Sequence, residues 1–183
     1  MYALEAEYSR VRGTSSVFSA RSIYVEARRN DAWSGEDYAG SSVQGAMKGL
    51  KEVGAYLEGD WPYESELEPL PGKKPALKIT AYSRIPKERT DLFIEALRSG
   101  KTVVISIRVT DDFSKVGNDG KLTISADALT SGGHSVCIVG YDGETDEFKF
   151  ANMWGTSWGS SGFGYIRRID LIDVVMDAYT LSL

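Results

Sequence analysis

The chain has 183 residues, and its 21 Lys and Arg against 26 Asp and Glu give a formal net charge of −5. Apolar residues make up 42% of the sequence and charged residues 26%, which is typical of a folded globular protein and not of a disordered one. Because the balance is acidic and the sequence contains no cluster of five or more Lys/Arg, we expect neither nucleic acid nor an anionic membrane among its partners.

The cysteine and histidine content limits the chemistry further. Cys137 is the only cysteine and His134 the only histidine, which excludes an intrachain disulfide and disfavours a zinc site. We expect neither a metal nor another cofactor. The first residues lack the pattern of a secretory signal, and no apolar run approaches the ~20 residues of a membrane span. We therefore expect a cytoplasmic protein or a subunit of a larger intracellular assembly.

The first part of the chain shows helical periodicity. Apolar residues recur along one helix face over 17–27, which predicts a helix there. A serine cap and a glycine stop predict a second helix over 43–53. A third stripe, over 86–99, begins at a proline and ends before a glycine. The stretch 64–78 is rich in proline and glycine, which indicates a loop that crosses between two lobes.

Beyond residue 100 the pattern changes to short strands. Segments rich in β-branched or aromatic residues alternate with Gly, Asp and Asn turns. The predicted strands are 102–109, 134–141, 147–151 and 163–167. Helices first and strands second indicate an α+β chain rather than an alternating βαβ one.

His134 is the first candidate for chemistry. It begins a predicted strand directly after Gly132 and Gly133, which would let another backbone or a ligand approach closely. Asn152 ends the next strand eighteen residues later, so a hairpin would bring its amide oxygen beside the imidazole and fix the tautomer. The alternative is a half-buried histidine near a loop and an asparagine in a turn.

The segment from Gly13 to Ala20 is the second candidate. It places Ser15 in the first turn of the helix predicted over 17–27, where free backbone N–H groups stabilise an anionic nucleophile or a developing oxyanion. The alternative is that Thr14 and Ser15 only cap the helix.

Three segments in a fixed order resemble the papain-like cysteine peptidases, in particular their compact bacterial branch. Gly13 to Ser19 is similar to the family's Gly-Ser-Cys-Trp/Val-x-Phe-Ser. Gly132 to Tyr141 nearly repeats Gly-Gly-His-Ala-Val-x-Ile-Val-Gly-Tyr. Asn152 to Gly162, with Tyr165, resembles Asn-Ser-Trp-Gly-x-x-Trp-Gly-x-x-Gly-Tyr. With weaker similarities between them, the resemblance covers nearly the whole chain.

The resemblance implies a papain-like α+β fold of two lobes. A helical left lobe, residues 1–70, would carry the nucleophile-position helix. A right lobe, residues 71–183, would form an antiparallel, barrel-like sheet that carries the histidine and the asparagine. Such proteins bind a peptide or protein substrate in the cleft between the lobes.

Site residues follow from the resemblance position by position. His134 would be the acid/base, Asn152 its orienter and Trp154 an apolar shield over their hydrogen bond. Gly133 and the backbone of Gly40-Ser41-Ser42 would bind the substrate.

Two positions depart from the family pattern. Ser15 stands where the family has its nucleophilic cysteine, and a hydroxyl does not form the resting thiolate–imidazolium pair. Ser9 stands where the family has the glutamine of the oxyanion hole, and losing such a donor costs about 10²–10³ in rate. The Ser15 N–H would remain as an oxyanion donor. Cys137 is no substitute nucleophile, because its odd offset from His134 sends it to the opposite face of the strand.

Three hypotheses follow. The first is an inactive homologue that keeps a peptide-binding or structural role, and both substitutions favour it. The second is an active cysteine peptidase that was disabled by an engineered change at Ser15, which leaves Ser9 unexplained. The third is a hydrolase that uses Ser15 itself as the nucleophile.

Overall fold

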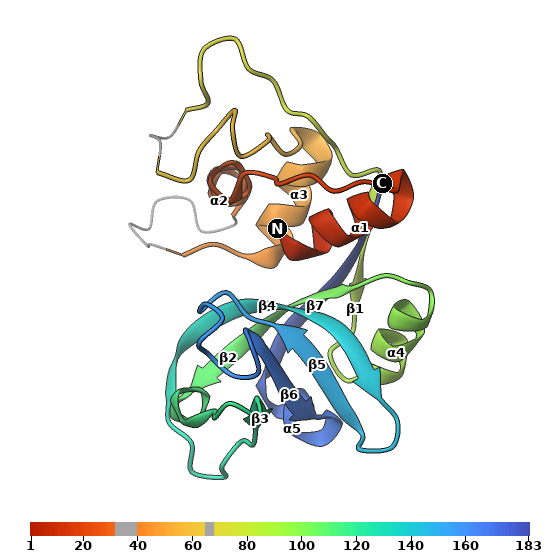
Figure 1. The fold of residues 1–183 in the computed structure, drawn as a ribbon, viewed down its shortest axis with the longest axis vertical. Coiled ribbons are helices and arrows are strands. Elements are labelled where there is room, and N and C mark those ends of the chain that lie inside the picture. Colours follow the sequence, from red (N-terminus) through yellow and green to blue (C-terminus); the bar gives the residue numbers. More distant parts are fainter. Residues whose placement is uncertain (32–39, 65–67) are drawn as a thin grey trace. The chain divides into compact units, whose positions relative to one another are not determined.

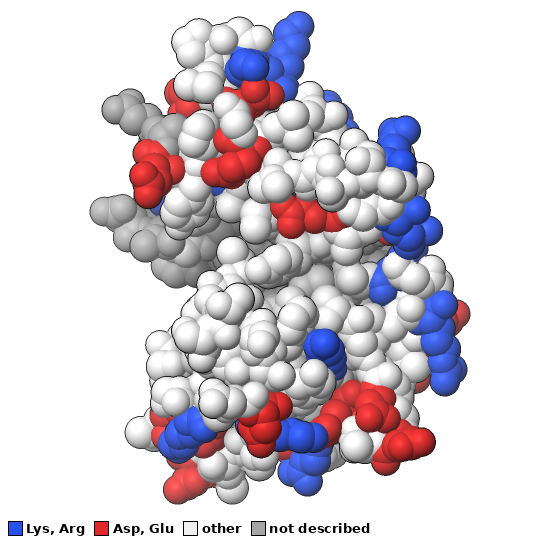
Figure 2. All heavy atoms as spheres, viewed as in Figure 1, with Lys and Arg blue, Asp and Glu red and all other residues white. Residues whose placement is uncertain are grey.

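The computed structural model describes residues 1–31, 40–64 and 68–183. The chain divides into two compact units, which we call the helical unit (1–83 and 181–183) and the sheet unit (84–180). The predicted boundary at 70/71 falls inside the helical unit. Of the predicted crossing loop, residues 65–67 lie outside the described residues. On the face shown in Figure 2, Lys and Arg lie among Asp and Glu on both units.

The helical unit contains α1 (Tyr2–Arg12), α2 (Ala20–Arg29) and α3 (Val43–Glu52), which Figure 1 labels. Helices α2 and α3 pack closely because α3 carries glycine at the contact. A Cβ atom built on Gly49 would lie 2.7 Å from the Cβ of Glu26. The predicted helix over 43–53 is confirmed to within one residue, since α3 ends at Glu52.

Two helices of this unit differ from the sequence-based expectation. Helix α2 begins at Ala20 and not at residue 17, with Ser19 as its N-cap. Helix α1 was not predicted, because its buried face is not purely apolar. That face includes Glu7, whose carboxylate pairs with Arg10 at 2.7 Å.

A seven-stranded sheet has the order β1-β7-β2-β4-β5-β6-β3 and lies mostly in the sheet unit. The β7–β2, β2–β4, β4–β5 and β5–β6 pairs are antiparallel, and the β6–β3 pair is parallel. Mixed helices and one sheet confirm the α+β class. The strands are β1 (Ala81–Ile85), β2 (Val103–Thr110), β3 (Lys121–Leu122), β4 (Thr130–Asp142), β5 (Glu147–Ala151), β6 (Phe163–Arg167) and β7 (Val175–Ser182). The helices are α4 (Thr90–Arg98), η1 (Asp111–Lys115) and α5 (Arg168–Val174).

Strands β2, β4, β5 and β6 confirm the four predicted strands, although β4 starts four residues earlier than expected. The third predicted helix is shorter than expected, since α4 begins at Thr90. One apolar core joins these elements: Phe93 of α4 packs with Phe148, and Ile105 and Ile138 come from the paired strands β2 and β4.

Candidate active site

Unequal strand lengths place His134. Strand β4 has 13 residues and its hairpin partner β5 has 5, and their last pair is Cys137 with Ala151. The first part of β4, which includes His134, therefore extends beyond the end of β5. His134 pairs with Ile107 of β2 on its other side, so the strand is still held in the sheet. The loop that follows Ala151 begins beside this extension.

The His134–Asn152 pair is formed as predicted. Nε2 of His134 lies 2.8 Å from Oδ1 of Asn152. The same oxygen accepts the backbone N–H of Met153 at 2.8 Å, which identifies it as the carbonyl oxygen of the amide. A carbonyl oxygen only accepts, so Nε2 of His134 donates. In the neutral imidazole, Nδ1 is therefore the nitrogen that accepts a proton.

Asn152 is fixed by its surroundings as well as by the imidazole. Its side chain is buried, and its backbone N–H donates to the carbonyl of Gly162 at 2.9 Å. That bond closes the loop between β5 and β6 at its base. Within the described residues, the Nδ2 atom of Asn152 is one of three buried side-chain polar atoms without a hydrogen-bond partner.

Trp154 covers the histidine. Its ring stacks on the imidazole of His134 with a centroid distance of 5.1 Å and an interplanar angle of 27°. Two further aromatic rings hold the indole edge-on: Phe113 at 6.0 Å and Trp158 at 5.6 Å. The indole N–H of Trp158 donates to the carbonyl of Phe113 at 3.1 Å.

Sequence reasoning missed Phe113 as part of this site. Trp158 belongs to the Trp-Gly-x-x-Trp-Gly segment that follows Asn152, so the sequence carried a signal for it. Phe113 lies in η1, some 40 residues away along the chain, and no motif marks it.

The prediction that Ser15 lies in the first turn of a helix is wrong. Ser15 is exposed in the segment between α1 and α2, five residues before Ala20. Ser19 caps α2 instead: its Oγ accepts the N–H of Ser22 at 2.9 Å and donates to the carbonyl of Trp61. Val17, which the pattern assigned to the apolar helix face, is 63% exposed. The role of Ser15 as a nucleophile stays a prediction.

Ser9 is exposed in the last turn of α1. Its carbonyl accepts the N–H of Gly13, which ends the helix in the left-handed conformation with φ of 68°. Its proposed oxyanion role also stays a prediction.

The segment Gly40-Ser41-Ser42 leads into α3. Ser42 is the N-cap: its Oγ accepts the N–H of Gly45 at 2.9 Å and donates to Asp31 at 2.6 Å. Its backbone N–H also donates to Asp31, and its carbonyl accepts the N–H of Ala46. Both backbone groups of Ser42 therefore have partners within the chain, and the substrate-binding role of Gly40, Ser41 and Ser42 stays a prediction.

Cys137 is buried at 4% exposure. Its neighbours Val136 and Ile138 both point into the core of the sheet unit, and side chains alternate along a strand. Cys137 therefore lies on the opposite face of β4 from His134, as predicted. Burial raises the pKa of its thiol.

Neither a metal cluster nor a membrane span is present within the part of the chain that the structure describes. No three His, Cys, Asp or Glu side chains there gather as metal ligands. None of the helices there is long and apolar enough to cross a bilayer.

Comparison with known proteins identifies relatives along most of the chain. The model of the papain family cysteine protease matches residues 5–179. A cathepsin L-like proteinase of Fasciola hepatica is 25% identical over 168 residues, which cover 90% of this chain and 50% of the relative. The gamete and mating-type specific protein A of Dictyostelium discoideum is 33% identical over 86 residues, 47% of this chain and 18% of the relative. The chain thus spans half or less of these curated relatives.

Solved structures show the same fold. Xylellain, a cysteine protease from Xylella fastidiosa, superposes with a TM-score of 0.79 at 24% identity, over 99% of this chain and 76% of that one. The Carica candamarcensis cysteine protease CMS1MS2, solved in complex with E-64, gives a TM-score of 0.77 at 20% identity, over 98% and 84%. The fold, the His134–Asn152 pair and the family match agree, and the chain belongs to the papain family of cysteine proteases.

Proposed function

We propose that this papain-family chain binds peptides at the strand end that carries Gly133 and His134, and that it does not hydrolyse them through a cysteine of its own. The observation that carries the proposal is the contrast between a formed His134–Asn152 pair and a buried Cys137, the only thiol of the chain.

Cys137 is unsuited to nucleophilic attack for two reasons. A cysteine attacks as its thiolate, and burial raises the pKa of this thiol, so the reactive form is disfavoured near neutral pH. Alternation along β4 also directs its side chain to the face opposite His134, so no proton passes directly between the two.

Ser15 is a weak substitute. Activation of a serine requires a base within hydrogen-bond reach and gains from a helix N-terminus that stabilises the developing charge. Ser15 precedes α2 by five residues, and the first turn of α2 is capped by Ser19. We therefore infer that neither Cys137 nor Ser15 is a competent nucleophile for the acid/base pair.

The start of β4 offers a backbone edge to a peptide. Residues 130–133 are exposed, and in this stretch only the β2 side of β4 is paired in the sheet. Gly133 has no side chain to hold a ligand away, and among the described residues a Cβ atom built on it would meet Met176 alone, at 3.5 Å. An extended peptide gains affinity by adding backbone hydrogen bonds to such an edge.

Thiol labelling tests the catalytic half of the proposal. The protein is incubated with a peptide epoxide that alkylates activated thiols, as the unchanged chain, as Ser15→Cys and as the neighbouring control Ser16→Cys. We expect both variants to react at the slow rate of an ordinary exposed thiol. Faster labelling of Ser15→Cys alone, abolished by His134→Ala, would overturn the inference that position 15 is unsuited to nucleophilic attack and establish it as the nucleophile site. Modification of Ser15 by a fluorophosphonate in the unchanged chain would do the same for a serine hydrolase.

Peptide binding tests the other half. Fluorescence polarisation with dye-labelled peptides of random sequence is measured for the unchanged protein, for Gly133→Leu and for Gly143→Leu, a control in the exposed β4–β5 turn. We expect Gly133→Leu to lose binding and Gly143→Leu to keep it. Equal binding by the two variants, or none by the unchanged protein, contradicts the proposed edge.

A further inference from the structure

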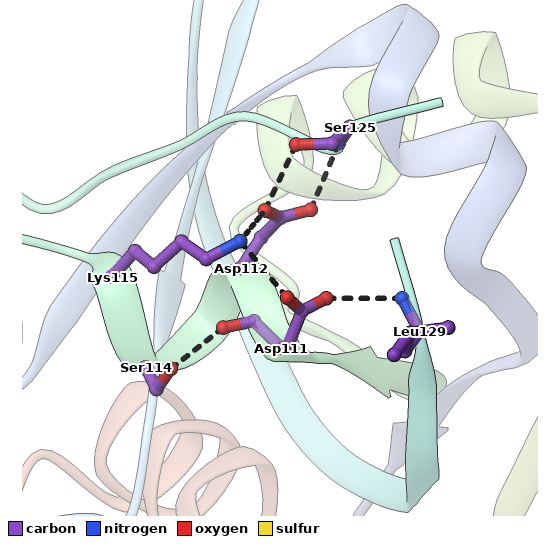
Figure 3. Close-up of polar contacts among 6 residues, drawn as sticks. All are labelled: Asp111, Asp112, Ser114, Lys115, Ser125 and Leu129. Atoms are coloured by element: carbon purple, nitrogen blue, oxygen red, sulfur yellow. Dashed lines mark hydrogen bonds and ion pairs between the residues drawn. The ribbon is translucent and has the colours of Figure 1, made fainter. Parts of the chain in front are cut away.

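The chain between β2 and β4 contains a polar network that the papain-type site does not explain. The network consists of Asp111, Asp112 and Lys115 of η1, with Ser125 and Leu129 of the segment that leads into β4 (Figure 3). We call it the η1 network. Figure 3 shows Lys115 lying between the two carboxylates.

Asp112 is the centre of the η1 network. Its side chain is buried, and it accepts the backbone N–H of Ser125 at 2.8 Å and the Ser125 hydroxyl at 2.9 Å. Lys115 donates to the same carboxylate at 3.0 Å. The Ser125 N–H, followed by Lys115, lowers the pKa of Asp112 to about 2, so the carboxylate is ionised throughout the neutral range.

Asp111 ties η1 to the other end of the same segment. Its carboxylate accepts the N–H of Leu129 at 3.0 Å, and its own N–H donates to the Leu129 carbonyl at 3.1 Å. Leu129 directly precedes Thr130, the first residue of β4. The two aspartates therefore fix η1 against both ends of the segment 125–129. The second end, Leu129, lies five residues before His134 in the sequence.

Phe113 lies between Asp112 and Lys115 in sequence and faces the aromatic side of the site. It is fully buried, its ring contacts Trp154 edge-on, and its carbonyl accepts the indole N–H of Trp158. Trp154 in turn stacks on His134. If η1 moves, Phe113 moves with it, and Trp154 then loses part of the packing that holds its ring over His134.

We propose that Asp112 is a positioning residue for His134: by anchoring η1 to Ser125, it holds Phe113 where it fixes Trp154 over the His134–Asn152 hydrogen bond. This inference deepens the proposed role of His134 and rests on it. The carboxylate of Asp112 is bound by Ser125 and Lys115, so its effect on the imidazole passes through Phe113 and the indole.

The single histidine permits a direct test. In a ¹H–¹³C NMR spectrum of the full chain, the ring signals of His134 are the only histidine signals, and stacking on Trp154 displaces them by the ring current of the indole. The spectrum is compared for the unchanged protein, for Asp112→Ala and for Phe113→Leu, which removes the ring but keeps the carbonyl. Asp91→Ala is the control, since Asp91 forms an exposed ion pair with Arg89 in the same unit.

We expect Phe113→Leu to remove much of the ring-current shift of the His134 signals and Asp112→Ala to remove part of it. Asp91→Ala should leave that shift unchanged. Should Asp112→Ala fail to fold, Ser125→Ala removes one of the three contacts of Asp112 and is expected to give a smaller change in the same direction. Folded Phe113→Leu and Ser125→Ala proteins with unchanged His134 signals overturn the proposal. Because the signals report ring geometry and not turnover, this failure is distinct from a failure of the proposed peptide binding.

Discussion

His134 and Ser15 carry two halves of one predicted site, and the chain builds their surroundings differently. His134 lies in a paired strand, donates to a buried asparagine and is covered by an indole that two more rings support. Ser15 lies exposed between two helices, and the cap that fixes the second helix is Ser19. The difference shows that a sequence motif predicts the position of a side chain best where that side chain is packed and hydrogen-bonded, as at His134, and less well where it is exposed, as at Ser15.

The largest expected effect comes from a substitution that tests how tightly strands β5 and β6 are packed. A Cβ atom built on Gly164 of β6 would lie 2.2 Å from the Phe150 ring on the paired strand β5. Gly164→Ala is therefore expected to destabilise the protein by about 3 kcal/mol or more through overpacking. Urea unfolding measures the change. Gly117→Ala, at an exposed turn with space for a methyl group, is expected to stay within about 0.5 kcal/mol and serves as the control.

The second prediction removes the partner of the imidazole. Asn152→Ala takes away the oxygen that accepts from both His134 and the Met153 N–H, and is expected to cost about 2 kcal/mol. ¹⁵N NMR of the single histidine is expected to show loss of the preferred Nε2–H tautomer. If the variant is as stable as the unchanged protein and keeps that tautomer, Asn152 does not orient the ring.

The third prediction compares two serines of the same motif. Ser19→Ala removes a buried helix cap that also donates to the Trp61 carbonyl, so we expect a loss of about 1–2 kcal/mol. Ser15→Ala changes an exposed position and is expected to shift stability by less than about 0.5 kcal/mol. Chemical denaturation of both variants measures the difference. Equal losses would mean that the Ser15 side chain has a structural role as well.

The smallest expected signal is a change in how stability depends on pH. The pKa of Asp112 is lowered from 3.8 to about 2 in the folded chain, so its contribution is complete above about pH 5 and is lost progressively as the pH falls toward 2. Urea unfolding between pH 2 and 5 is expected to show a shallower acid loss for Asp112→Asn than for the unchanged protein. Parallel curves would show that the Asp112 carboxylate adds no net stability.

The sequence predicted the His134 half well for physical reasons. Four β-rich segments with turns between them fixed the hairpin of β4 and β5, and the hairpin brings Asn152 to His134. Phe113 escaped prediction because its contact with Trp154 depends on where η1 is anchored. That anchoring comes from Asp112 and Ser125, whose pairing no local pattern reveals.

Prediction failed for the Ser15 half because its motif consists mainly of small polar residues. Thr14, Ser15 and Ser19 all have side chains that can cap a helix, so local propensity does not choose among them. Tertiary contacts determine which residue caps the helix, because Ser19 is buried and has both a donor and an acceptor partner inside the helical unit. Helix α1 was missed for a related reason, since a buried Glu7 paired with Arg10 interrupts the apolar stripe.

The different lengths of β4 and β5 have an evolutionary consequence. The imidazole belongs to a strand that the sheet needs, whereas the groups that tune it belong to the loop after Ala151 and to η1. Substitutions in those two segments can change the tautomer and the cover of the imidazole while the strand that carries it stays paired with β2. The site can therefore change in a lineage separately from the sheet.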